Sequence, residues 1–480
     1  MKFKNLLGIA IFFTVCLLFL QFLRLKSHTK LYLSSGEINE LVKDEPIRFT
    51  PYNVRRNRVI NYTKIDIKTK YLESKNLKEF KPFETNVDEI HFKSKLPPIP
   101  DGLKTSMLKE DDTIYFRNIN NTDCYLRGLN LEESLKLQTC VCIDNYYGKH
   151  CSIPEAIWFS DLPKKYISKI TTRKSKPRRI IVAFPFNMEL ELLNARISLT
   201  YDFVDAFVIL ESNYTGFGDR KPLFLYDALR QGYYQEFEKK LVYVHLNFYP
   251  KEASGKAGGD GWIADALFRN YMGQHGMTKQ LKGYRHDDIL LMHDADELIM
   301  PEVTQFLKLH DNYPEPFGVN LKWNIYGFFW QGNKPIWHIM CGCTMGFLAH
   351  VLNYKAYEVR TADRAMVRHS SKLNSYLKTG VNIRTWDIGS EQYPAGWHCS
   401  WCGSPETVRH KLESAINADF PRWGNYPEKR KLPFIKSLIN NGIWFDEQSR
   451  FTKCNNNSKF YAPPYLLRYR ETYKYLLENV

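Results

Sequence analysis

Short apolar segments alternate with helical patterns from about residue 178 onward, and this alternation constrains the fold more than any other feature of the chain. Four segments have the length and composition of buried strands, at 179–185, 204–210, 241–246 and 288–292. Apolar residues at helical spacing lie between them, at 189–199 and 262–282. Strands that alternate with helices form right-handed β-α-β units. The pattern therefore predicts an α/β domain with a mostly parallel sheet and flanking helices.

Two of the predicted strands run directly into acidic residues. The strand at 204–210 is followed by Glu211, and the strand at 288–292 is followed by the acidic segment 293–297, which reads His-Asp-Ala-Asp-Glu. In sheets of this kind, ligands bind at the carboxyl ends of the strands. We therefore expect the ligand site at this edge of the sheet. Glu211 would accept hydrogen bonds from the ribose or base of a nucleotide, or else order a loop.

Asp294 and Asp296 lie two residues apart, so an extended or turning backbone can direct both carboxylates at one point. Adjacent carboxylates repel each other and are costly to desolvate, and a divalent cation relieves both costs. Oxygen ligands suit Mg²⁺ or Mn²⁺, which then hold substrate phosphates. The motif predicts a divalent metal site for the diphosphate of a nucleotide sugar. The alternative is an acidic loop that caps the following helix.

Three further residues are candidates for the same site. Asp265 and Arg269 belong to the predicted helix ahead of the acidic strand, and an arginine suits bidentate phosphate contact. The alternative for Arg269 is an exposed position on that helix. His398 can complete the metal shell as a neutral imidazole, or can be a buried structural histidine.

A general base for an acceptor hydroxyl is expected among the carboxylates. Glu406 follows Ser404 and Pro405, which together indicate the start of a helix. Its carboxylate is therefore a candidate base or only a capping acid. The other candidates for this role are Asp265, Asp387 and Asp419.

Aromatic residues make up 15% of the chain, a high fraction that suits a large core or a sugar-binding cleft. Three tryptophans near the predicted site, Trp330, Trp397 and Trp401, are candidates to stack on sugar faces. Core packing is the alternative for each of them.

The amino-terminal segment 5–23 contains no charged side chain. As a helix it would span about 28 Å, close to the hydrocarbon thickness of a membrane. Basic residues flank the segment, and no small-residue cleavage site follows it. The sequence therefore predicts an uncleaved signal anchor at 5–23 behind a cytosolic tail at 1–4.

Nine of the ten cysteines and four N-x-S/T sequons follow this anchor, which favours an oxidising lumen. We therefore expect a single-pass type II Golgi membrane protein with a luminal catalytic domain. That compartment excludes nucleic acid as the partner of the net charge of +15.

Residues 24–120 are polar and show no lasting hydrophobic period, so they are interpreted as a stem. The segment 121–155 ends in the C-x-C-x5-G-x2-C spacing of an EGF-like repeat, and it has four cysteines where a full repeat has six. The proposed pairing, Cys124 with Cys140 and Cys142 with Cys151, is one of three that four cysteines allow.

Five cysteines lie further along the chain. They form a C-x-C pair (Cys341, Cys343), a C-x-x-C pair (Cys399, Cys402) and a single Cys454. Disulfides between the two pairs are expected in an oxidising compartment, with Cys454 as the odd residue. A zinc site is the alternative.

The motifs of this chain resemble those of glycosyltransferase family 17. The matching segments, spread over about 178–470, are F-V-I-L-E-S-N-Y-T (207–215), D-G-W-I-A-D (260–265), D-A-D-E (294–297), Y-G-F-F-W (326–330), A-G-W-H-C-S-W-C (395–402), D-F-P-R-W-G (419–424) and Y-A-P-P-Y-L-L (461–467). Family members carry an aspartate at the position of His293.

The resemblance implies a GT-A-like domain over 175–475 and a UDP-GlcNAc donor. It also implies a divalent metal, inversion at the anomeric carbon, and transfer in a β-1,4 bisecting linkage to the core β-mannose of N-glycans on glycoproteins. In this interpretation Glu211, Arg269 and Asp294 bind the donor, and Asp294, Asp296 and His398 hold the metal. Two alternatives remain: an anchored EGF-bearing interaction protein with an inactive GT-A-like domain, or the same fold with another donor or acceptor.

Overall fold

The computed structural model describes residues 106–249, 261–414 and 422–479. All of these belong to one unit of the chain, Val54–Val480. The predicted anchor at 5–23 and most of the predicted stem lie outside the described residues. Among the residues described, no helix is both long enough and apolar enough to cross a membrane.

One half of the central sheet is parallel, as the alternating pattern predicts. Its strands, in the order β11-β7-β8-β9, are β11 (Ile289–Met292), β7 (Ile180–Phe186), β8 (Ala206–Ser212) and β9 (Leu241–Leu246). Each begins within two residues of its predicted start. The helix predicted at 189–199 is α6 (Leu190–Thr200).

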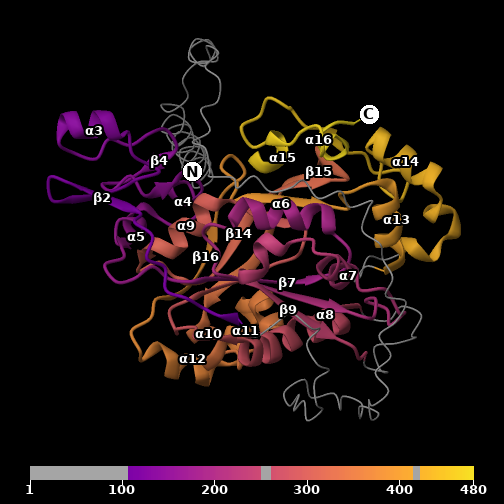
Figure 1. The fold of residues 1–480 in the computed structure, drawn as a ribbon, viewed down its shortest axis with the longest axis horizontal. Coiled ribbons are helices and arrows are strands. Elements are labelled where there is room, and N and C mark those ends of the chain that lie inside the picture. The colour runs from indigo at the N-terminus through magenta and orange to yellow at the C-terminus, as the bar shows by residue number, and fades with distance from the viewer. Residues whose placement is uncertain (1–105, 250–260, 415–421, 480) are drawn as a thin grey trace, which may run out of the picture. The chain divides into compact units, whose positions relative to one another are not determined.

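Helices cover both faces of this parallel half. Alternate side chains of β7 enter different apolar clusters: Val182 packs in the cluster that includes residues of α6, and Ile181 packs in the cluster that includes residues of α8 (Gly261–Tyr271). In Figure 1, α6 and α8 lie on opposite sides of the strands. Because the side chains of a strand alternate between its faces, a strand buried on both sides is apolar throughout.

The other half of the sheet is mixed, so the prediction of a mostly parallel sheet is wrong there. The strands β14 (Glu315–Ile325) and β15 (Gly327–Thr344) form a long antiparallel hairpin, and β15 pairs antiparallel with β11. Only Tyr326, with a φ of 61°, separates the two strands. A connection this short allows only antiparallel pairing.

The sheet continues from β14 to β17 (Gly396–Ser400) and then to β12 (Glu297–Ile299). The remaining strands outside the amino-terminal module are β1 (Ser106–Met107), β6 (Thr171–Thr172), β10 (Leu281–Lys282), β13 (His310–Asp311), β16 (Ile383–Ile388) and β18 (Thr452–Lys453). The remaining helices outside the amino-terminal module are α4 (Glu155–Trp158), α5 (Lys164–Ile167), α7 (Phe224–Arg230), α9 (Pro301–Leu309), α10 (Met345–His350), α11 (Ala362–Arg368), α12 (Ser370–Leu377), α13 (Pro405–Ser414), α14 (Leu432–Asn441), α15 (Pro464–Arg468) and α16 (Lys474–Leu477). A π-helix occupies Met272–Gln280. Segments of 3₁₀ helix occupy Gln235–Lys240, Ala356–Thr361, Trp423–Asn425 and Pro427–Arg430.

A small disulfide-bonded module precedes the sheet. It contains the hairpin of β2 (Phe116–Ile119) and β3 (Thr122–Tyr125), the helix α3 (Leu131–Leu137), and the hairpin of β4 (Tyr146–Tyr147) and β5 (Ile153–Pro154). The predicted disulfides Cys124–Cys140 and Cys142–Cys151 are confirmed.

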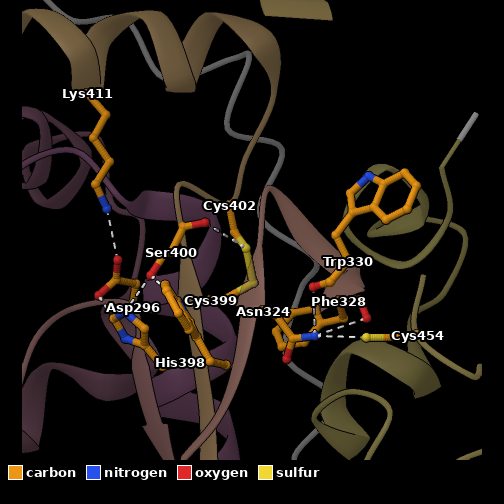
Figure 2. The surroundings of a disulfide bond; sticks show 11 residues. Asp296, Asn324, Phe328, Trp330, His398, Cys399, Ser400, Cys402, Lys411 and Cys454 are labelled. Carbon is orange, nitrogen blue, oxygen red and sulfur yellow. Dashed lines mark hydrogen bonds and ion pairs between the residues drawn. A yellow bond between two sulfur atoms is a disulfide. The ribbon is translucent and has the colours of Figure 1, made fainter. Parts of the chain in front are cut away.

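The predicted disulfides between the C-x-C and C-x-x-C pairs are wrong. Cys399 and Cys402 bond to each other across the end of β17 (Figure 2). Cys341 and Cys343 are free and buried within β15, and Cys454 is free as expected. Because two of the four sulfurs already form a disulfide, the alternative of a zinc site built from these cysteines is also excluded.

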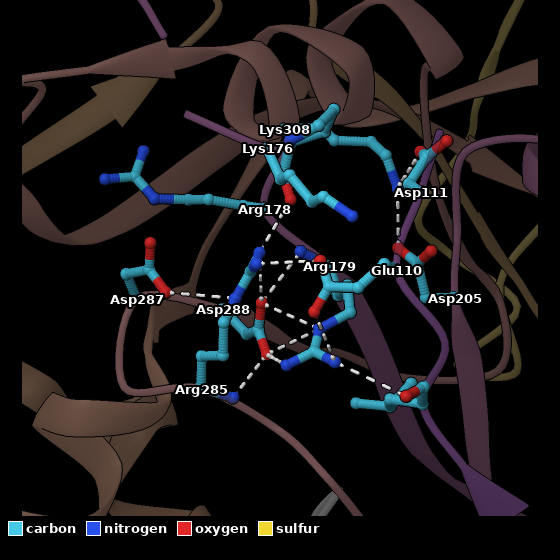
Figure 3. A network of polar contacts seen from close by, with 12 residues as sticks. Glu110, Asp111, Lys176, Arg178, Arg179, Asp205, Arg285, Asp287, Asp288 and Lys308 are labelled. Atoms are coloured by element: carbon cyan, nitrogen blue, oxygen red, sulfur yellow. Dashed lines mark hydrogen bonds and ion pairs between the residues drawn. The ribbon is translucent and has the colours of Figure 1, made fainter. Parts of the chain in front are cut away.

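A buried network of ion pairs anchors the segment before the module to the sheet (Figure 3). Arg179 at the start of β7 pairs with Asp288 at 2.7 Å, and both side chains are almost fully buried. Lys308, on α9, contacts Asp111 and Asp205 at 2.7 Å each. Burial opposes ionisation of Asp111, but Lys308 outweighs it and lowers the pKa of Asp111 to about 2.

Replacing Lys308 by methionine should destabilise the fold by about 3 kcal/mol, because two partly buried carboxylates lose their shared cation. Urea unfolding of the purified domain measures the loss. The matched control is Lys176→Met, since Lys176 is 56% exposed and pairs with an exposed Asp112. The control should change the unfolding free energy by less than about 1 kcal/mol. Equal losses of unfolding free energy in the two variants would show that the buried ion pairs of Lys308 contribute no more to stability than an exposed pair.

Candidate active site

A cavity of about 1050 Å³ lies at the carboxyl ends of the parallel strands. Its lining includes Pro185 and Phe186 from the end of β7, Ser212 from the end of β8, and Asp294, which follows β11. The cavity is therefore at the edge where the sequence predicts a ligand site.

The acidic segment reverses direction within this cavity. The Glu297 amide donates to the Asp294 carbonyl at 3.1 Å, and the Asp294 amide donates to Glu297 Oε2 at 2.6 Å. The turn leads into β12, where Glu297 pairs with His398 of β17. This pairing brings a histidine from a distant part of the chain beside the acids.

Each carboxylate of the segment has a basic partner. Arg269 contacts Asp294, and it also contacts Asp265 one helical turn earlier on α8. Arg360 forms a bidentate pair with Glu297 at 2.8 and 3.0 Å. Lys411, on α13, extends toward Asp296 and pairs with it at 2.8 Å (Figure 2).

The basic partners keep the two aspartates ionised. Burial raises the pKa of Asp294, but Arg269 and Arg360 outweigh it and hold that pKa below its ordinary value. Burial likewise opposes ionisation of Asp296, and Lys411 and His398 still lower its pKa. The cavity therefore presents fixed negative and positive charges side by side, which suits a site for a phosphate-bearing ligand.

Of the predicted residues, Asp265, Arg269, Asp294, Asp296 and His398 all line the cavity. The two aspartates have different partners, because arginines hold Asp294 and a lysine holds Asp296. The sequence predicts that Asp294 and Asp296 direct their carboxylates at one ion, whereas in the structure each carboxylate contacts its own basic side chains.

The side chains of the cavity offer only part of a ligand set for the divalent metal that the sequence implies. Within the described part of the chain, no group of three or more His, Cys, Asp or Glu side chains is arranged as a ligand set. The buried Nδ1 atom of His398, however, has no hydrogen-bond partner and lies 3.9 Å from Asp296 Oδ1 and from Glu297 Oε1. A nitrogen and a carboxylate oxygen facing each other in this way fit an ion that takes its other ligands from substrate phosphates.

Glu211 does not reach the cavity. It is fully buried, and its carboxylate accepts hydrogen bonds from the Leu225 and Tyr226 amides at 2.9 and 3.0 Å and from the Tyr243 hydroxyl at 2.7 Å. These amides begin α7, so Glu211 caps that helix instead of binding a nucleotide.

Glu406 also lies outside the cavity lining and is exposed on α13. The Thr407 amide donates to Ser404 Oγ at 3.2 Å, so the helix start that the sequence indicates is confirmed. That start points Glu406 to solvent, which argues against a role as the base. Asp387 pairs with His338 at 2.7 Å away from the cavity, and Asp419 lies outside the described residues.

Two of the three predicted sugar-stacking tryptophans belong to the core. The indole N–H groups of Trp330 and Trp397 donate to the carbonyls of Ile439 at 2.7 Å and Phe460 at 2.9 Å, and both rings are buried. Trp401 lines the cavity but is only 6% exposed.

Sequence reasoning missed Arg360 and Lys411. They come from segments 63 and 115 residues beyond their acidic partners. Each sits in an ordinary helical context, so no local pattern marks it. The sequence indicates only that such partners must exist, because several acids buried together require cations nearby.

The contact between α6 and α13 predicts a pH dependence of stability. Thr407 Oγ1 donates to the carboxylate of Glu191 at 3.4 Å. Burial raises the pKa of Glu191 to about 7, above its ordinary 4.5. A raised native pKa means that the contribution of this group to stability is present below pH 4.5 and is lost as the pH rises through 7.

Glu191→Gln should therefore melt like the wild type at pH 4.5 and at a higher temperature at pH 8. Thermal melts across this range measure the difference. Glu413→Gln, at an exposed position on the same α13, should show no such trend. A constant difference between wild type and Glu191→Gln at all pH values would contradict the shifted pKa.

Comparison with known proteins agrees with the resemblance of the motifs. Residues 168–346 match the model of glycosyltransferase family 17. The chain is 38% identical over 341 residues to beta-1,4-mannosyl-glycoprotein 4-beta-N-acetylglucosaminyltransferase of Mus musculus, which covers 71% of this chain and 61% of that protein. The protein of the same name from Homo sapiens is 37% identical over 341 residues, 62% of its length.

The match thus spans less than two thirds of the length of these relatives. No solved structure matches the chain significantly. The family match contains the ends of β7 and β8 and the acidic segment, all of which line the cavity. On this evidence residues 168–346 of the chain contain a glycosyltransferase family 17 domain.

Proposed function

We propose that this protein transfers GlcNAc from UDP-GlcNAc to the core β-mannose of N-glycans, in a β-1,4 linkage and with inversion. The observation that carries the proposal is that Arg269, Asp294 and Asp296 share one cavity at the carboxyl ends of the strands. The family and the names of the relatives support the choice of sugar and acceptor.

The charged side of the cavity suits the diphosphate of the donor. The nucleoside would lie against the ends of β7 and β8, where ligands of such sheets bind. Arg269, Arg360 and Lys411 are held in place by their acidic partners, so their charge is already oriented when the donor arrives. Positive groups fixed in advance stabilise the negative charge that develops on the departing UDP.

Asp296 and His398 are the residues that we propose hold a divalent ion together with the diphosphate. A bound ion would neutralise part of the charge on the leaving group. Of the candidate bases that the structure describes, which are Glu406, Asp265 and Asp387, Asp265 alone lines the cavity. We therefore assign to Asp265 the proton of the attacking hydroxyl. Its contact with Arg269 fixes the position of the carboxylate.

The transfer is tested with the purified domain, UDP-GlcNAc and a biantennary N-glycan, with products identified by mass spectrometry after glycosidase digestion. The expected product carries one additional GlcNAc on the core mannose. UDP-GalNAc and UDP-glucose serve as donor controls. Transfer from another donor or to another position would replace the proposed substrate pair, and UDP binding without any transfer would favour an inactive interaction protein.

Removal of divalent ions should lower the transfer rate at least tenfold, because the diphosphate would leave with less of its charge neutralised. The measurement compares the enzyme after dialysis against a chelator with the same enzyme after addition of Mn²⁺ or Mg²⁺. Full recovery on addition is expected. Undiminished transfer in excess chelator would show that the cations of the chain suffice.

The cellular setting is proposed on sequence grounds alone. A signal anchor at 5–23, a stem at 24–120 and an EGF-like module at 121–155 would place the domain at 175–475 in the Golgi lumen. Protection of the domain from protease in sealed vesicles, together with glycans at its sequons, is the expected result.

A further inference from the structure

The wall of the cavity formed by β14 and β15 is aromatic. Trp323 of β14 and Trp337 of β15 both line the cavity, and their ring centroids are 5.0 Å apart. Trp444 and Phe451 add further apolar surface to the lining. The charged residues described above come instead from the acidic segment that follows β11, from α8, from α13 and from the helical turn at Ala356–Thr361. The cavity therefore has two chemically different sides.

Trp337 is unusually accessible for a residue of its kind. Its exposure is 39%, and no other tryptophan whose side chain the structure describes is as exposed. An exposed indole contributes little to folding, and large exposed apolar groups beside a cavity indicate a binding surface. The ring is nevertheless held in place, because it stacks on the imidazole of His398 at 5.4 Å and 13°.

Trp323 is held by its surroundings as well. Its indole N–H donates to Ser400 Oγ at 3.0 Å. The backbone of Gly332 packs against the ring so closely that a Cβ at this position would lie 2.3 Å from it. The two indoles thus form a rigid aromatic surface that requires no rearrangement before a ligand binds.

We propose that the indole of Trp337, supported by Trp323, is the platform on which a mannose of the acceptor glycan stacks. The proposal rests on the proposed function and assigns its acceptor subsite. A pyranose presents an apolar face of C–H groups to one side and hydroxyl groups around its edge. That face matches the electron-rich face of an indole, whereas a diphosphate would be repelled by it.

The position of His398 connects the platform to the transfer site. The imidazole of His398 stacks on the indole of Trp337, and its Nδ1 atom lies 3.9 Å from Asp296 Oδ1. A sugar on the indole would therefore lie beside the acids and cations that we assign to the donor. Asn333, on the exposed part of β15, also lines the cavity and offers an amide to the hydroxyl groups of the sugar.

The test separates acceptor binding from catalysis. Trp337→Ala should raise the KM for the N-glycan about tenfold or more, while kcat and the KM for UDP-GlcNAc stay within about twofold. Trp337→Phe, which keeps an aromatic face, should recover most of the loss. Gly332→Ala, which displaces the ring of Trp323, should raise the same KM. Tyr426→Ala is the control, since Tyr426 is 40% exposed and does not line the cavity.

A direct measurement of glycan binding distinguishes failure of this proposal from failure of the proposed function. Saturation-transfer NMR of the biantennary glycan with the domain and UDP requires no turnover. Binding that is lost in Trp337→Ala supports the platform even if the wild type transfers no sugar. An unchanged glycan KM in Trp337→Ala with an active enzyme, or no glycan binding by the wild type, overturns it.

Discussion

Asp296→Asn is expected to lower kcat/KM for the transfer of GlcNAc about 100- to 1000-fold, the range found when one preorganised electrostatic group is removed from an active site. The carboxylate of Asp296 pairs with Lys411 and faces the unpartnered Nδ1 of His398. Asparagine keeps the shape of the side chain but removes the charge that orients both neighbours. Initial rates at several donor concentrations measure the effect.

The control for this prediction is Asp387→Asn. Asp387 pairs with His338 outside the cavity, so its kcat/KM should stay within about twofold of the wild type. Thermal melting of both variants shows whether a loss of rate reflects unfolding. If Asp296→Asn is folded and as active as the control, Asp296 is not part of the transfer site.

Arg360→Met should destabilise the protein by about 3 to 5 kcal/mol, the cost of leaving a buried carboxylate without its partner. Glu297 is fully buried, and Arg360 holds both of its oxygens. The same variant should also lose most of its affinity for UDP. Arg360 lines the cavity 3.5 Å from Asp294, and we assign its positive charge to the diphosphate. Urea unfolding and calorimetric titration with UDP measure the two effects.

Arg360→Lys should recover only part of the stability, since an ammonium group cannot replace a bidentate guanidinium. Arg368→Met is the matched control, because Arg368 is 55% exposed and its partner Glu358 keeps a second contact, with His369 at 2.7 Å. It should cost less than about 1 kcal/mol. A stable Arg360→Met protein with wild-type affinity for UDP would contradict the role given to this arginine.

The parts of the fold that follow from local patterns were predictable. The strands β7, β8, β9 and β11 are continuous apolar runs, and their alternation with helices is sufficient to place the ligand site at their carboxyl ends. The proposed module disulfides, one of the three pairings that four cysteines allow, are the ones that the structure contains. In each case the residues that interact, or the elements that they form, are close in sequence.

The β14–β15 hairpin and the cations of the site were not predictable in this way. Nothing in the spacing of Arg360 or Lys411 marks them as partners of Glu297 and Asp296, because the contacts exist only after distant segments pack together. For Glu211 the local pattern is misleading. Its position at the end of a strand predicts a ligand contact, but its carboxylate caps α7.

Burial decides the roles of the tryptophans, and a single sequence does not reveal burial. Trp330 and Trp397 stand in motifs that resemble the family, yet both are core residues with indole donors bonded to backbone carbonyls. Trp337 belongs to none of the quoted motifs, and its side chain is 39% exposed.

The position of bound UDP tests the central claim most directly. We predict that a crystal structure of the domain with UDP and Mn²⁺ shows the diphosphate between the 294–297 turn and the side chains of Arg360 and Lys411, with the uracil against the ends of β7 and β8. UDP bound elsewhere, for example in the second cavity lined by Arg178 and Lys372, would contradict the account.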